Sequence, residues 1–382
     1  MGAELTAHTS PLHPNPKVPA WWGDLFARSE SATLFLSSEW IQTWLDVYAS
    51  KFGGFWVRWV AQDNTVGGCL ILKRTVWWQI IPQPTLFLNV AAETVELSPW
   101  SEFNQPLYIA GYAEAVAEAL AHLVNRIRWA RFEFWGYEDG AFSQAFLKSL
   151  SQYTLQTREE RAPFVDLKAI EGQEYEGTLS SKTRPQIRRS RRMYEDSGGP
   201  VEIRFAQDEA EALAFLAELG IMHNAIWRSR GEVGSFERPE FRSFHEEVVK
   251  RLWAAQAVDL IQIKTSEKVI GYLFNFKLGK KIYCYQSGFV QEEDKNFKPG
   301  LLTHATAISA YMRLQYEEYD LLSGDSRYKR SLTKNGRTLF WSTAYRRSAY
   351  GRLLWLARQL KARWRSKAAA QDPDSAAGIV ET

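Results

Sequence analysis

An amine and a phenol stand side by side near the C-terminal end of the sequence, in the run from Gly324 to Lys329. The ammonium of Lys329 could stabilise the oxyanion of a tetrahedral acyl-transfer intermediate, or the phosphates of an acyl donor. Tyr328 could protonate a leaving thiolate or pack its ring under the turn. Asp325 could accept a proton from an amine or cap the turn. On composition alone, a solvated lysine in a basic turn is the simpler interpretation.

A predicted helix start precedes this run, because Pro299-Gly300 is typical of the first turn of a helix. The backbone N–H groups from about Gly300 to Thr303 would have no partner within the helix. Together with the positive end of the helix dipole they would attract a pyrophosphate. A strand over 319–323 connects this helix to the turn. Helix start, strand and Lys329 together suit an acyl donor that carries phosphates.

Two stretches of the sequence, 297–302 and 319–330, resemble the end of the acyltransferase domain of CelD-like and BioF2-like proteins, which belong to the GNAT superfamily. The run from His223 through Phe236 to His245 resembles the middle of that domain, and 179–194 resembles its basic opening helix. The resemblance covers roughly 177–343 and is specific in the Gly-Asp-x-x-Tyr-Lys turn. Of the longer glycine-rich loop of simpler members, only Pro299-Gly300 remains.

The resemblance implies acetyl-coenzyme A as the donor and no metal, with Lys329, Tyr328 and Asp325 as catalytic residues. It favours Lys329 as a functional residue over the solvated lysine. The residues implied in donor binding are Lys298, Gly300, Leu301, Leu302, Thr303, Gly324 and Arg188, and those implied in acceptor binding are His223, Trp227, Phe236 and His245. A related branch, the Fem-type peptidyltransferases, takes its acyl group from aminoacyl-tRNA.

Basic and histidine side chains add further candidates, each with a simpler alternative. Arg184, Arg188 and Arg192 recur every four residues and would share one helical face that could bind phosphates, although charge runs are usually solvated faces. His223 lies four residues before Trp227, hence on one helical face, and either His223 or His245 could act as a base near neutral pH. A hydrogen-bonded core histidine is the alternative for both.

Composition places the chain among soluble globular proteins without naming a partner. Of its 382 residues, 45% are hydrophobic and 24% charged, and the net charge of +3 says little about partners. We expect no DNA partner. Most of the 16 tryptophans should lie in the core. Cys69 and Cys284 stand in apolar runs and should be buried thiols. His, Cys, Asp and Glu residues do not recur at the spacing of metal ligands, so we expect no metal. The sequence has no long apolar run, so we expect a cytoplasmic protein.

The same order of predicted helices and strands occurs twice along the chain, which predicts a tandem duplication. A helix at 39–48 precedes a hairpin of strands 55–61 and 69–73, much as a helix at 241–255 precedes strands 259–264 and 269–277. Helix 113–127 then leads into strand 131–135, as helix 301–314 leads into 319–323. Alternating helices and strands are common in any α/β protein, which is the competing explanation.

The predicted fold is therefore α/β, with tandem GNAT-like units that have mixed central sheets. We expect a disordered leader at 1–20, a non-catalytic GNAT-like domain at 21–170 and a GNAT acyltransferase domain at 171–345. A basic amphipathic helix at 346–370 should precede a disordered tail at 371–382. The segment from Arg352 to Lys367 could rest on an anionic membrane surface, or pack on the domain by its apolar stripe.

The predicted activity is transfer of an acetyl group from acetyl-coenzyme A to an amine or hydroxyl. The acceptor would be a small molecule or a precursor of the cell envelope or of a polysaccharide, as the resemblance to this family suggests. Two alternatives remain. One is a Fem-type peptidyltransferase that uses aminoacyl-tRNA, for which tRNA would be a partner. The other is a non-catalytic binding module at a membrane or a polysaccharide assembly.

Overall fold

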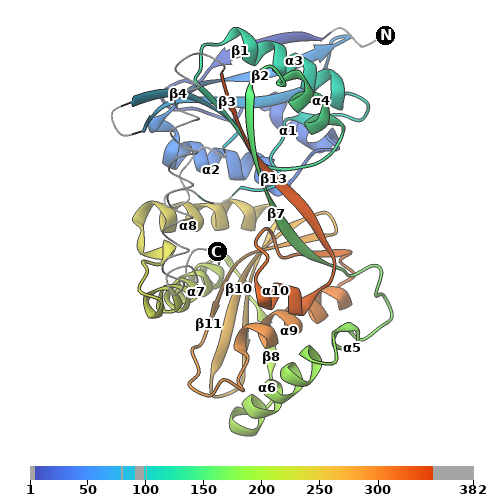
Figure 1. The fold of residues 1–382 in the computed structure, drawn as a ribbon. Helices are drawn as coiled ribbons and strands as arrows, with labels where there is room; N and C mark the ends of the chain where they lie inside the picture. The colour runs from blue at the N-terminus through green and yellow to red at the C-terminus, as the bar shows by residue number, and fades with distance from the viewer. Residues whose placement is uncertain (1–4, 79–80, 91–98, 100, 347–382) are drawn as a thin grey trace, which may run out of the picture. The chain divides into compact units, whose positions relative to one another are not determined.

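The computed structural model describes all residues except 1–4, 79–80, 91–98, 100 and 347–382, so the helix expected at 346–370 and the tail at 371–382 lie outside the described residues. The chain divides into two compact units, each considered by itself (Figure 1). Unit 1 contains residues up to Glu160 together with Thr338 onward, and unit 2 contains Arg161–Arg337. The division therefore precedes the expected boundary at 171, and the last described strand belongs to unit 1.

Unit 1 is a mixed sheet in the order β1-β2-β3-β4-β6-β13, in which β4 and β6 are parallel and all other neighbours are antiparallel. A short strand, β5, pairs with β3. The strands are β1 (Thr6–Pro11), β2 (Gly53–Ala61), β3 (Asn64–Trp78), β4 (Ile81–Leu88), β5 (Leu107–Tyr108), β6 (Arg131–Glu138) and β13 (Gly336–Tyr345).

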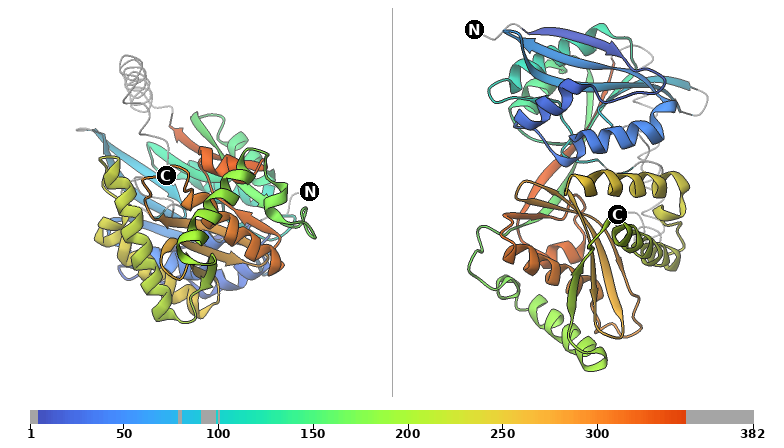
Figure 2. Two further views of the ribbon diagram at one scale, coloured as in Figure 1. Left: turned by 90° about the horizontal axis from the view of Figure 1, so that it is seen from below. Right: turned by 180° about the vertical axis from the view of Figure 1, so that it is seen from behind.

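The helices of unit 1 cover both faces of its sheet. Helices α3 and α4 pack on one face, and α1 and α2 lie on the other (Figure 2). Trp59, Leu120 and Phe146 share a core on the first face. Trp22 of α1 and Trp44 of α2 are buried against the second. The helices are α1 (Ala20–Arg28), η1 (Leu34–Leu36), α2 (Ser38–Tyr48), η2 (Ala49–Lys51), α3 (Ala113–Arg126) and α4 (Ala141–Ser149). Among the described residues seven tryptophans are buried, all of them in this unit, whereas Trp77 is 65% exposed.

Unit 2 repeats the same arrangement in the order β8-β9-β10-β11-β12-β7, again with one parallel pair, β11 and β12. Its strands are β7 (Thr154–Asp166), which begins in unit 1, β8 (Glu202–Phe205), β9 (Val258–Lys264), β10 (Val269–Leu278), β11 (Lys281–Phe289) and β12 (Glu318–Asp320). The matching strand orders and directions confirm the tandem α/β fold.

The helices of unit 2 likewise divide between the two faces of the sheet. Helices α7 and α8 lie on one face, and α5, α6, α9 and α10 lie on the other (Figure 1). The helices are α5 (Tyr175–Thr178), α6 (Thr183–Gly198), α7 (Glu209–Ser229), η3 (Ser235–Glu237), α8 (Pro239–Ala254), α9 (Pro299–Arg313) and α10 (Arg327–Leu332). Helix α9 begins at Pro299, as the sequence predicted.

Two local expectations were wrong. The leader is ordered from β1, whose six side chains are all exposed but whose backbone pairs with β2 from Thr6 opposite Val60 to Pro11 opposite Phe55. An edge strand gains its hydrogen bonds from the backbone, so it needs no apolar pattern. The turn that ends in Lys329 is partly a helix, α10, and the strand before it ends at Asp320 rather than Ser323.

Candidate active site

In unit 2 the two parallel strands of the sheet separate after a short stretch of pairing. Strands β11 and β12 pair from Lys281 opposite Glu318 to Tyr283 opposite Asp320. Beyond that point the chain after β12 stays with β7, because the N–H of Leu321 donates to the Pro163 carbonyl at 2.9 Å. Strand β11 stays with β10 as far as Phe289. Each strand keeps its outer neighbour, so the sheet opens between them.

A β-bulge lies beside this opening. Phe274 of β10 is opposite Gln286, while the next residue, Asn275, is opposite Cys284, so Tyr285 is the extra residue on β11. A bulge locally bends its strand and re-aims side chains, and bulges are frequent next to active sites. Here it accompanies the divergence of β11 from β12.

The N-terminus of α9 is held next to the basic helix α6. The N–H of Lys298 donates to the buried Ser190 hydroxyl of α6 at 2.9 Å. The first helical bond within α9 runs from the Leu302 N–H to the Lys298 carbonyl at 2.9 Å, so the N–H groups before Leu302 have no partner within the helix. A Cβ at Gly300 would meet the Phe289 ring at 3.3 Å. The helix start therefore presents backbone where a side chain would be crowded.

Lys329 is buried, with 7% of its surface exposed, so the solvated-lysine interpretation was wrong. Its Nζ donates to the carbonyls of Leu322 at 3.3 Å and of Ser323 at 2.5 Å. Leu322 itself has a positive φ of 61°, and its N–H donates to the buried Asp320 carboxylate at 2.7 Å. The loop after β12 is thus fixed by the Asp320 carboxylate and the Lys329 ammonium. The ammonium places a positive charge near the opening.

The other two predicted catalytic residues have different surroundings. The Asp325 carboxylate forms ion pairs of 3.4 Å with Arg161 and with Arg330, so it serves to hold the turn before α10. Tyr328 is 37% exposed, and its ring stacks on His304 with 5.5 Å between centroids. Gly324, with a φ of 102°, allows the turn that places them.

His304 is a polar residue of this site that the sequence reasoning missed. It lies on α9, four residues after Gly300, and is fully buried. Its Nδ1 is 3.9 Å from the Cys284 thiol. Burial, and next the charge of Lys329, lower the pKa of His304 to about 3. The available signal was a histidine one turn after the Pro-Gly that begins the helix. Both cysteines are buried free thiols, as expected.

The predicted acceptor residues form a cluster on the other face of the sheet, between α7, α8 and β11. The indole N–H of Trp227 donates to Nε2 of His223 at 3.0 Å, and His223 meets Phe236 edge to face. His245 donates from Nδ1 to the Phe241 carbonyl at 2.6 Å, and its Nε2 accepts from the hydroxyl of the bulged Tyr285 at 3.1 Å. The structure brings these four predicted residues together, but on the face opposite Lys329.

Both histidines of this cluster are neutral. Burial lowers the pKa of His245 to about 3 and the pKa of His223 to about 4. Both ring nitrogens of His245 are hydrogen-bonded, so His245 fits the alternative of a hydrogen-bonded core histidine. His223 accepts from Trp227 at Nε2, and the side chain of Asn224 is a second hydrogen-bond partner of its ring.

The basic helix α6 shows an exposed arginine face. Ile187, Ser190 and Tyr194 are buried toward α9, whereas Arg188 and Arg192 are exposed. Arg184 is half-buried, and its guanidinium donates to the Leu179 carbonyl at 3.4 Å. The exposed face is therefore formed by Arg188 and Arg192, and its role in binding phosphate stays a prediction.

In unit 1 the chain itself fills the corresponding opening between β4 and β6. Asn104 donates from Nδ2 to the Leu88 carbonyl at 3.0 Å and from its backbone to the Gly136 carbonyl at 2.9 Å, so it joins the two strands. The buried Asn89, with a φ of 52°, donates to the Asn104 side chain at 2.8 Å. The first turn of α3 also carries Glu114, whereas that of α9 carries no acid.

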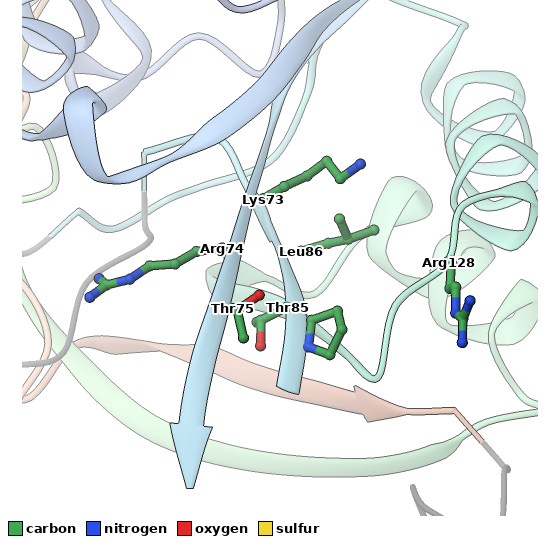
Figure 3. A pocket seen from close by; sticks show the side chains of 7 residues that line it. Lys73, Arg74, Thr75, Thr85, Leu86 and Arg128 are labelled. Atoms are coloured by element: carbon green, nitrogen blue, oxygen red, sulfur yellow. The ribbon is translucent and has the colours of Figure 1, made fainter. Parts of the chain in front are cut away.

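A shallow pocket of 170 Å³ in unit 1 also carries basic side chains (Figure 3). Lys73 and Arg74 extend from opposite sides of β3, as neighbours in a strand do (Figure 3). The basic groups therefore do not converge on one ligand. The residues that line this pocket are Lys73, Arg74, Thr75, Pro84, Thr85, Leu86 and Arg128.

Comparison with known proteins agrees with this architecture. Residues 181–330 match the family model of the acetyltransferase (GNAT) domain. Unit 2 therefore carries a GNAT-type acetyltransferase domain, and unit 1 repeats its strand order. No curated protein matches the sequence.

Solved structures with the same fold span nearly the whole chain. FemX is 11% identical, with 87% of this chain and 96% of that chain covered and a TM-score of 0.54. L-PGS from Bacillus licheniformis is 14% identical, with 91% and 97% covered and a TM-score of 0.53. A protein of unknown function from Bacteroides thetaiotaomicron is 12% identical, with 87% and 99% covered and a TM-score of 0.51. At these identities the similarity establishes the fold alone.

The described residues contain neither a cluster of metal ligands nor a membrane-spanning helix. Within the part of the chain that the structure describes, no group of three or more His, Cys, Asp or Glu side chains is placed to hold a metal ion. Among the same residues, no helix has the length and apolar character needed to cross a membrane.

Proposed function

We propose that unit 2 transfers an acetyl group from acetyl-coenzyme A to an amine or hydroxyl acceptor by direct attack. The observation that carries this proposal is the opening between β11 and β12, with the start of α9 and the buried Lys329 on one of its sides. The GNAT family match over 181–330 supports it. The acceptor would be a small molecule or a precursor of the cell envelope or of a polysaccharide.

The donor would lie along the α9 side of the opening. Its pyrophosphate would accept hydrogen bonds from the N–H groups that follow Pro299, and Gly300 would permit the close approach of backbone and phosphate. Lys298, the residues from Leu301 to Thr303, and Arg188 of α6 would complete this binding surface. Gly324 would allow the loop beside the thioester to turn.

The reacting end of the donor would lie near Lys329. Its ammonium, fixed by two carbonyls, would favour the negative charge that develops on the thioester oxygen. Tyr328 would protonate the departing thiolate, and Asp325 would keep the turn in place through its two arginine partners.

The acceptor would approach from the other face of the sheet, where His223, Trp227, Phe236 and His245 gather. Acceptor and donor would meet beyond Tyr283, where no backbone pairing joins β11 to β12.

Aminoacyl-tRNA is the second candidate donor, and the exposed arginine face of α6 favours it. Arg188 and Arg192 could contact nucleic-acid phosphates as well as those of coenzyme A. The two candidates differ in what stabilises the protein. Coenzyme A should raise the melting temperature only under the first.

Calorimetry with coenzyme A and acetyl-coenzyme A tests the donor. We expect binding to the unmodified protein and weaker binding to Gly300→Val, because the added side chain blocks the backbone and crowds Phe289. Gly53→Val is the matched control, since a Cβ at that exposed position of β2 meets nothing closer than 4.0 Å. Absence of binding to the unmodified protein at millimolar concentration would refute coenzyme A as the donor.

A further inference from the structure

His304 carries an N–H group for which the protein supplies no acceptor. The thiol of Cys284 stays protonated because burial raises its pKa to about 11. The S–H can therefore donate to Nδ1 of His304, which is 3.9 Å away. Because the imidazole is neutral, its one hydrogen then lies on Nε2. Nε2 is buried and has no hydrogen-bond partner.

Unpaired buried donors are rare in folded proteins because each loses its hydrogen bond to water without replacement. The same turn of α9 holds a second such group, the Thr303 hydroxyl, which is also fully buried and without a partner. A bound ligand could supply partners for these two neighbouring polar groups.

The surroundings of His304 indicate which part of a ligand it would meet. Its ring lies edge to face with Phe289 at 5.6 Å, and Phe289 in turn contacts the position of Gly300. On its other side the ring stacks on Tyr328, the residue next to Lys329 in the chain. His304 therefore lies between two parts of the proposed donor site: the helix start at Gly300, where the pyrophosphate would bind, and the buried ammonium of Lys329. The thioester of a bound donor would occupy that interval.

We propose that the Nε2–H of His304 donates a hydrogen bond to the thioester carbonyl oxygen of the acyl donor. This inference rests on the function proposed above. When the acceptor attacks, a bond forms between its nucleophilic atom and the carbonyl carbon, and the electron pair of the C=O bond moves onto the oxygen. The hydrogen bond strengthens as that charge develops, and the charge of Lys329 adds to it. The tetrahedral centre then collapses and expels the coenzyme A thiolate, while the imidazole keeps its proton throughout.

A neutral ring suits this role. Because the pKa of His304 is lowered to about 3, the imidazole is an uncharged donor near neutral pH. A histidine that acted as a base would need a pKa near the working pH. His304 is thus a catalytic residue by contact with the reacting oxygen rather than by proton transfer.

The test compares the affinities of acetyl-coenzyme A and coenzyme A, which differ in the presence of that carbonyl. By calorimetry, the unmodified protein should bind acetyl-coenzyme A roughly 2- to 10-fold more tightly, the range expected for one net hydrogen bond. His304→Phe keeps the ring and its stacking but removes the N–H, so the preference should disappear. His304→Gln places an N–H donor at a similar distance from the backbone and should retain part of it.

Thermal melting without ligand supplies a second measurement that a purely structural role would not explain. His304→Phe should melt at or above the temperature of the unmodified protein, because it removes an unpaired buried donor. Tyr311→Phe is the matched control, since the buried hydroxyl of Tyr311 donates to the Asp259 carboxylate and accepts from the Asn275 amide. That variant should melt at a lower temperature and keep the preference for acetyl-coenzyme A.

The possible failures are distinguishable. If neither ligand binds the unmodified protein, the proposed function is wrong. If both bind and His304→Phe keeps the preference for acetyl-coenzyme A, the role of His304 is wrong while the donor assignment stands. Equal affinities of the unmodified protein for the two ligands would also refute the role of His304.

Discussion

Replacing Lys329 with alanine tests the electrostatic centre of the site, and the structure predicts two separate effects. The first is on stability, because the change leaves the carbonyls of Leu322 and Ser323 without the ammonium that they bind. Hydrogen bonds to a charged group contribute about 1.5–3 kcal/mol each. Relief of the buried charge offsets part of this. We therefore expect a loss of about 3 kcal/mol, or roughly 6–12 °C in melting temperature for a domain of this size.

The second effect of Lys329→Ala is on rate. Removing one preorganised group that stabilises an oxyanion costs roughly 10²- to 10³-fold in turnover. Lys329→Arg should recover little, because a planar guanidinium does not replace a compact ammonium between two carbonyls. Release of the coenzyme A thiol, once an acceptor is in hand, measures turnover at a temperature where the variant remains folded.

A matched control lies five residues further along the chain. Lys334 is exposed, so Lys334→Ala should change neither the melting temperature nor the rate. A Lys329→Ala protein that melts and turns over like the unmodified protein would refute both parts of the reasoning. A loss of stability with full activity would leave Lys329 as a residue that fixes the loop and nothing more.

Three further predictions concern pH and salt. His223, His245 and His304 have pKa values of about 4, 3 and 3 in the folded protein, below the usual value of about 6.5 in an unfolded chain. The unfolded chain therefore binds more protons below pH 6.5, and stability should fall as pH is lowered, by about 1.4 kcal/mol per pH unit for each histidine. Melting temperatures from pH 7 to pH 5 check this, and His304→Phe should lessen the slope. Burial would raise the pKa of Glu318, but its basic neighbours lower it overall. The contribution of Glu318 to stability should therefore be present at pH 7 and lost as pH falls below about 4. Melting temperatures of Glu318→Gln should fall less over that acidic range than those of the unmodified protein. Arg188→Glu should weaken coenzyme A binding and flatten its dependence on salt if the arginine face of α6 binds phosphate; affinity unchanged across a salt series would leave that face solvated.

The sequence predicted elements whose signals are local. Helix α9 was placed because Pro299-Gly300 marks a helix start, and the two hairpins were placed by alternating apolar residues around turn residues. The echo between the halves followed from these elements. Each of these signals lies within about fifteen residues, which is the range over which periodicity and capping act.

The rest depended on pairings between distant parts of the chain. β13 follows unit 2 in sequence but pairs with β6 of unit 1, and β7 begins in unit 1 but pairs with β12. No local pattern indicates such partners. For the same reason the burial of Lys329 was missed, because the carbonyls that bind it follow β12, which pairs with β7. His304 was missed because its unpaired N–H is visible only when its neighbours are known.

Unit 1 and unit 2 share a strand order, and the difference between them predicts one donor per chain. In unit 2 the backbone beyond Tyr283 has no neighbour on the β12 side, and the amide groups of a donor could pair with it. In unit 1 Asn104 already joins Leu88 to Gly136 at the matching place, so a donor would have to displace satisfied hydrogen bonds. It would also meet Glu114 at the start of α3, where a carboxylate repels phosphate. Calorimetric titration with coenzyme A should therefore give a stoichiometry of one, and Gly300→Val should weaken the whole of the signal. A second binding event that survives this substitution would show that the segment around Asn104 yields to a ligand.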